Sequence, residues 1–188
     1  MKTLTKLLNN NMKSYEIRVR PTVLPIFFEK WASMLFLPLR VWLGWEWLTS
    51  GYHKLFNPAW MVSGEALKGF WAKAVVVDDG KGAITYDWYR SFIQYLFDIQ
   101  AYTWFAKLVA CGEIMVGIAL IIGAFVGVAA FFGALMNWNF MMAGSASTNP
   151  MLFLVSIFLI LGWRGAGYIG ADYFLLAWLR QRLHPIYR

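Results

Sequence analysis

The sequence predicts an all-α membrane protein, a four-transmembrane-helix up-down bundle with an amphipathic extracytoplasmic connection between the first two helices. The chain is 60% hydrophobic and only 14% charged, whereas soluble domains carry about 25% charged residues. Aromatic residues make up 19%, with 11 Trp, which suits rings that settle at the headgroup level. Four long apolar segments fill most of the 188 residues. A single transmembrane domain over residues 32–180 is therefore expected.

The chain begins with a basic segment, residues 1–31, which carries six Lys/Arg against two Glu. No hydrophobic core with a small-residue cleavage site follows at once, so a removable signal peptide is not expected. We interpret the segment as cytoplasmic and interfacial. The first span is then predicted over about residues 32–54, with a bend at Pro38.

A 45-residue connection, 56–100, follows the first span and is nearly neutral and rich in aromatic residues. Asp78-Asp79-Gly80 and Lys81-Gly82 indicate a turn in its middle. We predict two short amphipathic helices around that turn, resting on the membrane surface and capping the bundle. A connection of this length is seldom without function, although a hairpin that only anchors the surface is the alternative.

The other spans are predicted at about residues 102–123, 127–143 and 151–168. A small-polar loop, 144–150, joins the last two, and an interfacial helix over 173–183, with Asp172 as its N-cap, leads to a basic tail, 181–188. Both termini are basic, so the positive-inside rule predicts that both are cytoplasmic, in the cell membrane of a prokaryote. The segments 56–100 and 144–150 then lie outside.

Ionisable residues inside the apolar segments are the strongest indication of function, because a charge at the bilayer centre costs roughly 2.5–3.5 kcal/mol. Glu46 and Glu113 are expected near the middle of spans one and two, as a pair at one level that shares or relays protons. Arg40 is the expected counter-charge, and Asn137 and Asn139 are expected nearby. The alternative is a network that only fixes helix register. Arg164, in the fourth span, is expected to snorkel to the cytoplasmic surface.

A second group of charges lies at the predicted outer end of the bundle. His53, Lys54 and Lys107 are expected to attract a small anion, unless His53 and Lys54 are only interfacial anchors. The run Gly165–Gly170 matches G-x-G-x-x-G, but it ends a membrane helix, so a dinucleotide site is not expected. One Cys and two widely separated His argue against metal, haem or iron–sulfur binding, and no flavin motif is present.

Three motifs resemble those of the DoxX/DoxD family. They are Gly44-Trp45-Glu46-Trp47-Leu48-Thr49-Ser50-Gly51-Tyr52-His53-Lys54-Leu55 with Asn57-Pro58, Gly112-Glu113-Ile114-Met115-Val116-Gly117, and Met136-Asn137-Trp138-Asn139-Phe140-Met141-Met142-Ala143-Gly144 with Ser147-Thr148-Asn149-Pro150. The likeness extends over roughly residues 33–180. It implies a four-helix membrane protein and, from the family's best-described activity, the membrane subunit of a thiosulfate:quinone oxidoreductase that forms tetrathionate. The polar positions that match are Glu46, Lys54, Glu113, Asn137 and Asn139.

The leading hypothesis is therefore a quinone-linked oxidoreductase subunit. A quinone head would enter between the helices near Trp47, Asn137 and Asn139, while thiosulfate approaches from outside. The expected partners are the lipid bilayer, the quinone, a second redox subunit that is DoxA-like or otherwise soluble, and a further copy of the chain; nucleic acid is not expected. The alternatives are a non-catalytic scaffold for redox proteins and a carrier of small solutes or protons.

Overall fold

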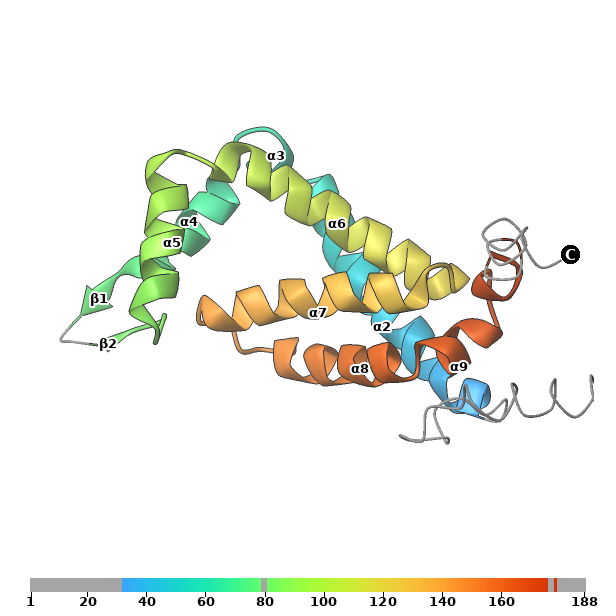
Figure 1. Ribbon diagram of the computed structural model, residues 1–188. Coiled ribbons are helices and arrows are strands. Elements are labelled where there is room, and N and C mark those ends of the chain that lie inside the picture. Colours follow the sequence, from blue (N-terminus) through green and yellow to red (C-terminus); the bar gives the residue numbers. More distant parts are fainter. Residues whose placement is uncertain (1–31, 79–80, 176–177, 179–188) are drawn as a thin grey trace, which may run out of the picture.

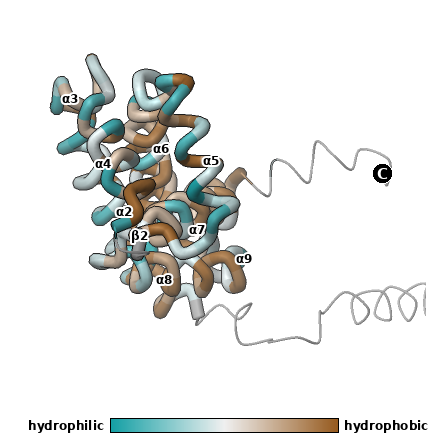
Figure 2. Tube along the Cα trace, turned by 90° about the vertical axis from the view of Figure 1, so that its left-hand side faces the viewer, coloured by the Kyte–Doolittle hydropathy of each residue, from teal (hydrophilic) through white to brown (hydrophobic). Residues whose placement is uncertain are grey.

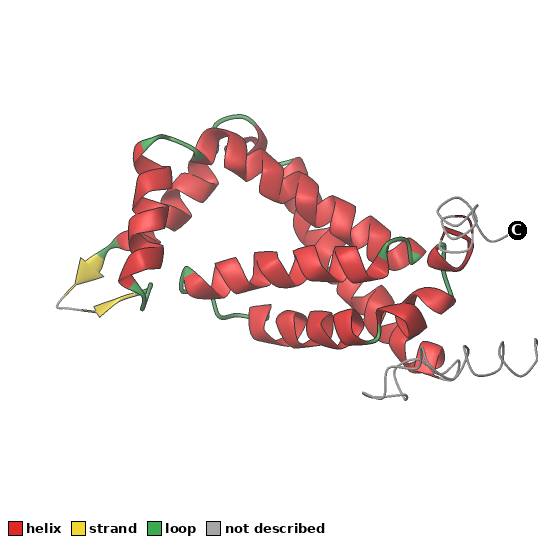
Figure 3. Cartoon of the chain, in the orientation of Figure 1, coloured by secondary structure: helices red, strands yellow, loops and turns green. Residues whose placement is uncertain are grey.

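The computed structural model describes residues 32–78, 81–175 and 178, and these are mostly helical (Figure 3). The longer helices are α2 (Ala32–Leu55), α6 (Tyr102–Ile122), α7 (Val126–Met142) and α8 (Asn149–Leu161). The predictions for residues 1–31, for the tail 181–188 and for most of the helix 173–183 lie outside the described residues.

The fourth apolar segment forms two helices instead of one. α8 ends before Gly162, and α9 (Trp163–Tyr168) continues the chain. Gly162 packs against the ring of Phe36 so closely that a side chain there would overlap it. The break therefore lets the start of α2 approach the end of α8.

α2 packs against α6 through glycines on both helices. A Cβ at Gly117 would lie 2.6 Å from the backbone nitrogen of Leu48 and 2.8 Å from the carbonyl oxygen of Gly44. Farther along, a Cβ at Gly51 would lie 2.9 Å from the backbone nitrogen of Ile114. Small residues allow helix backbones in membranes to approach in this way. These contacts fix both the antiparallel direction and the axial register of the two helices.

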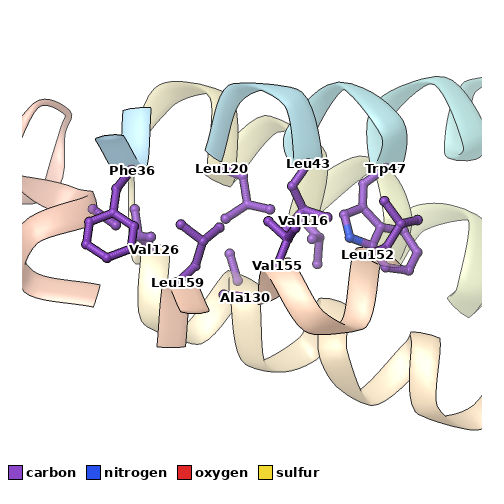
Figure 4. Close-up of a cluster of buried hydrophobic side chains, with 12 residues drawn as sticks. Phe36, Leu43, Trp47, Val116, Leu120, Val126, Ala130, Leu152, Val155 and Leu159 are labelled. Atoms are coloured by element: carbon purple, nitrogen blue, oxygen red, sulfur yellow. The ribbon is translucent and has the colours of Figure 1, made fainter. Parts of the chain in front are cut away.

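The core of the bundle lies between α2, α6, α7 and α8 (Figure 4). Leu43 of α2, Leu120 of α6 and Leu159 of α8 have no exposed surface. In Figure 4 the side chains of the four helices point toward one another in a continuous row. Apolar contact thus unites the four segments that the sequence identifies.

The connection between α2 and α6 contains the two predicted helices around a turn, and a short additional helix precedes them. α3 (Pro58–Met61) and α4 (Glu65–Val75) lead to the strands β1 (Val77–Asp78) and β2 (Lys81–Gly82), which pair antiparallel and are followed by α5 (Asp87–Asp98). α4 and α5 share a second apolar core with the start of α6. The tube in Figure 2 shows hydrophilic positions recurring along α3–α5.

The helices α6 and α7 diverge from the turn that joins them, and α4 and α5 lie across the open side of this V (Figure 1). Among the described helices, Tyr102–Ile122 has both the length and the apolar composition needed to cross a membrane, and Val126–Met142 and Asn149–Leu161 are apolar but shorter.

Candidate functional site

A polar pocket of about 460 Å³ lies at the end of the bundle where α2 ends and α8 begins. Its polar walls come from the last turns of α2, the middle of α6 and the loop before α8. Its lining polar side chains are Glu46, Thr49, Ser50, His53, Lys54, Glu113, Ser145, Ser147, Thr148 and Asn149. We call this cavity the polar pocket.

An ion pair between α2 and α6 forms part of the wall of the polar pocket. Lys54 Nζ lies 2.7 Å from Glu113 Oε2, and the Glu113 side chain is 1% exposed against 18% for Lys54. Lys54 also donates to Ser50 Oγ at 2.7 Å, one turn earlier on α2, and its ammonium lies 5.2 Å from the ring centroid of Trp60. The charge of Glu113 is thus compensated from the last turn of α2, where the helix dipole favours a cation.

The predicted pair of Glu46 and Glu113 at one level is wrong, and the glycine contacts give the reason. A Cβ at Gly51 would lie 3.0 Å from the Cβ of Glu113, so Glu113 lies opposite Gly51. Glu46 is five residues away, about 7.5 Å along the helix axis at 1.5 Å per residue. It is half-buried and lines the same pocket, but its carboxylate has no ion pair among the described residues.

Asn137 of α7 is fully buried in the bundle. Gly133, one turn before Asn137 on α7, would carry a Cβ 3.0 Å from Trp47 Nε1, and Trp47 itself lies one turn before Gly51 on α2. Asn137 therefore lies on the side of α7 that faces α2 at Trp47. Within the described part of the chain, Trp47 Nε1, both polar atoms of the Asn137 side chain and Glu113 Oε1 are buried without a hydrogen-bond partner. Such atoms are costly to bury unless water or a ligand satisfies them.

Arg40 does not serve as the counter-charge of the carboxylates. Its guanidinium donates to the carbonyl oxygens of Ala166 at 2.6 Å and Ile169 at 2.8 Å, and it packs against Gly123. Gly123 is ten residues after Glu113, about 15 Å along α6. Arg40 therefore fastens α2 to the end of α9, far from the polar pocket.

Asp172, predicted as the N-cap of the following helix, instead caps α7. Its carboxylate accepts hydrogen bonds from the backbone N–H groups of Phe125, at 2.6 Å, and Val126, at 2.9 Å. A carboxylate at a helix N-terminus is favoured by the dipole and by the unpaired amides there. The sequence could not show this, because the two segments are 46 residues apart. Arg164 is exposed, with its guanidinium 5.3 Å from the Trp163 ring centroid.

The predicted outer group of three cations is only partly assembled. His53 and Lys54 both line the polar pocket, whereas Lys107 does not line it and is exposed on α6. Lys107 lies six residues before Glu113, so it points about 120° away around the helix. His53 is exposed at the pocket rim.

Sequence reasoning missed the contribution of the loop before α8. Ser147, Thr148 and Asn149 line the polar pocket, and α8 begins at Asn149 with no side-chain hydrogen bond capping it. The first-turn N–H groups of Asn149, Met151 and Leu152 already donate to the carbonyl oxygens of Ala146 and Thr148, so it is the positive end of the helix dipole that favours an anion here. A small-polar loop directly before an apolar helix was the available signal.

A second cavity of about 490 Å³, which we call the apolar chamber, occupies the V between α6 and α7 and is closed by α4 and α5. Asn139 faces this chamber instead of the polar pocket. The Tyr89 hydroxyl donates toward the carbonyl oxygen and Oδ1 of Asn139, each at 3.1 Å. Burial raises the pKa of Tyr89 to about 12, so its phenol stays protonated at neutral pH. Neither the chamber nor Tyr89 was predicted from the sequence.

The amino-acid sequence of this chain matches one protein-family model. No curated protein and no solved structure matches the chain. The DoxX family model matches residues 35–145, more than half of the chain and the part that contributes α2 to α7. The motifs around Glu46 and Glu113, which led to the resemblance, lie inside that match. The chain therefore belongs to the DoxX family of membrane proteins.

Proposed function

We propose that this protein is the membrane subunit of a quinone-linked oxidoreductase that oxidises a small sulfur oxyanion of the thiosulfate class. The observation that carries the proposal is the Lys54–Glu113 ion pair, at 2.7 Å, between two helices of an apolar bundle and beside a cavity. Ionisable groups at such depth are rare and mark pathways or sites. The membership of the DoxX family supports a membrane location.

The proposed topology has four spans, formed by α2, α6, α7 and the pair α8–α9, with both termini cytoplasmic in a prokaryotic cell membrane. The basic character of both terminal segments supports this orientation. At 1.5 Å per residue, the 24 residues of α2 and 21 residues of α6 extend about 36 and 32 Å, enough for a hydrocarbon core of about 30 Å. The polar pocket then opens toward the outer surface.

The polar pocket suits a small anion. Lys54 supplies a positive charge, His53 supplies a hydrogen-bonding ring at the rim, and the start of α8 supplies the positive end of a helix dipole. Glu113 limits the net positive charge deep in the bundle. An anion bound at Lys54 weakens the ion pair, which frees Glu113 to accept a proton and pass it on.

The proposed reaction balances without a metal or flavin. Two thiosulfate ions form the S–S bond of one tetrathionate and release two electrons, which reduce one quinone to quinol. The quinone takes up two protons in the same step. Glu113 is proposed to relay these protons from the polar pocket toward the quinone, and a second redox subunit, DoxA-like or otherwise soluble, is the proposed partner.

The test is quinone reduction by the purified full-length protein in liposomes, with thiosulfate as donor and decylubiquinone as acceptor, with and without co-purified partners. We expect turnover in the wild type and a loss of at least tenfold in Glu113→Gln and Lys54→Met. Lys107→Met is the matched control, because Lys107 is an exposed lysine of α6 outside the pocket, and it should retain full turnover.

Other outcomes assign the protein to the alternatives. Absence of turnover together with stable retention of a soluble redox protein, unaffected by Glu46→Gln, indicates a scaffold. Flux of thiosulfate or protons across the liposome without quinone reduction indicates a carrier. Either result overturns the oxidoreductase proposal.

A further inference from the structure

We propose that the apolar chamber is a second ligand site, separate from the polar pocket, and that it binds one neutral-headed lipid of the quinone class with its head against Tyr89 and Asn139. This inference rests on the proposed function, which requires a quinone but leaves its position open. Of Trp47, Asn137 and Asn139, which the sequence placed around the quinone head, this site keeps Asn139 alone.

The lining of the chamber selects a neutral, lipophilic molecule. None of the described residues that line it is charged, and most are aromatic or aliphatic. Its volume of about 490 Å³ falls in the range of small-molecule sites, about 300–1,000 Å³. A phospholipid headgroup carries a phosphate that needs a cation or several N–H donors, and this lining offers neither. A quinone head carries no charge, and aromatic side chains can stack against its ring.

The chamber opens on the apolar outer surface of the bundle. Three of its lining residues are largely exposed: Leu108 at 57%, Met115 at 70% and Phe132 at 50%. They lie on α6 and α7, the two arms of the V in Figure 1. In a bundle that spans the bilayer, such residues face acyl chains. A ligand dissolved in the membrane can therefore enter from the side while its chain stays in the lipid.

The polar end of the chamber can hydrogen-bond the head of the ligand. Asn139 Nδ2 donates to the carbonyl oxygen of Leu135 at 2.8 Å, and its second hydrogen has no acceptor among the described residues. The single hydrogen of the Tyr89 hydroxyl is donated to Asn139, so Tyr89 orients the Asn139 amide. One neutral donor, held in place on an otherwise apolar wall, matches the carbonyl oxygen of a quinone.

The two cavities share a wall but not a lumen. Phe70 and Phe140 line both of them. Gly112 lines the apolar chamber, and the next residue, Glu113, lines the polar pocket. The two ring systems and this turn of α6 therefore separate an anion at Lys54 from a ligand in the chamber. Both should bind at once without competing.

The experiment measures binding without turnover, on the full-length protein in phosphatidylcholine nanodiscs. The probes are decylubiquinone, for affinity, and a photoreactive azido-ubiquinone, for mapping. We expect crosslinks on α5, α6 and α7 around the chamber, and an unchanged dissociation constant in the presence of saturating thiosulfate. Labelling of the residues around Glu46 and Lys54 instead, or displacement of the quinone by thiosulfate, overturns the inference.

Variants that fill the chamber give the sharper test. Gly112→Leu adds a side chain to the wall of the chamber and should weaken decylubiquinone binding at least tenfold. The backbone tolerates it, because a Cβ at Gly112 would lie 3.5 Å from Met136 Sδ. Gly69→Leu is the matched control, since a Cβ there meets nothing within 4 Å and Gly69 does not line the chamber. Leu135→Trp fills the chamber from α7, and its decylubiquinone binding provides the same test if Gly112→Leu does not fold.

The polar end is tested separately. Tyr89→Phe removes the hydrogen bond that orients the Asn139 amide and should weaken binding about three- to tenfold. Tyr95→Phe, on the exposed face of the same helix, should have no effect. Wild-type affinity in both chamber-filling variants, or equal competition by phosphatidylcholine, contradicts the assignment. Quinone binding without thiosulfate oxidation would leave this site standing and refute only the proposed function.

Discussion

Removing one member of the Lys54–Glu113 pair should destabilise the protein more than removing both. The pair has a separation of 2.7 Å and is buried on the Glu113 side, which is 1% exposed. Breaking a buried pair costs about 3–5 kcal/mol, because it leaves the other charge without compensation, whereas replacing both members is often nearly neutral. The structure therefore predicts a strong coupling between the two positions. It also predicts an asymmetry between the costs of the two single substitutions.

The asymmetry follows from what each remaining charge can still contact. Lys54→Met leaves Glu113 without its cation inside the bundle, so we expect a loss of about 3–5 kcal/mol. Glu113→Gln leaves Lys54, which is 18% exposed and keeps its bond to Ser50 and its contact with Trp60. Its cost should be smaller, about 1–3 kcal/mol. The double variant should lie within about 1 kcal/mol of the wild type.

Thermal unfolding of the four proteins in one detergent measures this cycle. At about 2–4 °C per kcal/mol for a chain of this size, Lys54→Met should lower the apparent Tm by roughly 6–20 °C, and the double variant should recover most of that loss. A double variant whose Tm falls by the sum of the two single losses would refute the reasoning, because additive effects mean that the two groups do not interact.

Three further predictions concern other parts of the molecule. Arg40→Met should lower stability by about 2–4 kcal/mol, because two hydrogen bonds at the end of α9 are lost and Asp172 loses its nearby cation. Its affinity for thiosulfate, measured by calorimetry on the folded fraction, should match the wild type; a selective loss of that affinity contradicts the structural role. Tyr89, with its pKa raised from 10.0 to about 12 by burial, contributes stability that is fully present below about pH 10 and is lost as the pH rises through about 12. Absorbance titration of phenolate should show one late-titrating tyrosine that disappears in Tyr89→Phe, and an unchanged titration refutes the burial. Gly117→Ala should destabilise by about 1–3 kcal/mol, since its Cβ would lie 2.6 Å from a backbone atom of α2. Gly69→Ala, in open space, should instead stabilise α4 by about 0.5–1 kcal/mol. The Tm of each variant tests this pair, and equal effects would contradict the proposed α2–α6 contact.

Much of the local structure could be predicted from the sequence. The apolar runs predict α2, α6 and α7 to within one or two residues, and Asp78 and Gly82 correctly predict the turn between α4 and α5. These features depend on hydrophobic runs and on turn-forming residues close in sequence, so they are local. The break at Gly162 was not predicted, because its cause is the approach of Phe36 from the other end of the chain.

The candidate site could be predicted in its members but not in its pairings. The sequence by itself identifies Glu113 and Lys54 as functional candidates, because charges in apolar segments are costly wherever the helices lie. It assigned them to two different groups. Their pairing depends on the stagger of α2 against α6, which backbone contact at Gly44, Gly51 and Gly117 sets.

The sequence thus determined the helical membrane character of this DoxX family protein, the course of its chain and the residues that carry charge into the bundle. Only the tertiary structure decided that Arg40 binds the end of α9, far from the polar pocket. It also decided that Glu46 lies more than one turn away from Glu113, and that an aromatic wall separates two cavities. The physical reason is geometric. Helix formation follows from neighbours along the chain, whereas an ion pair or a cavity depends on how helices are rotated and shifted against one another.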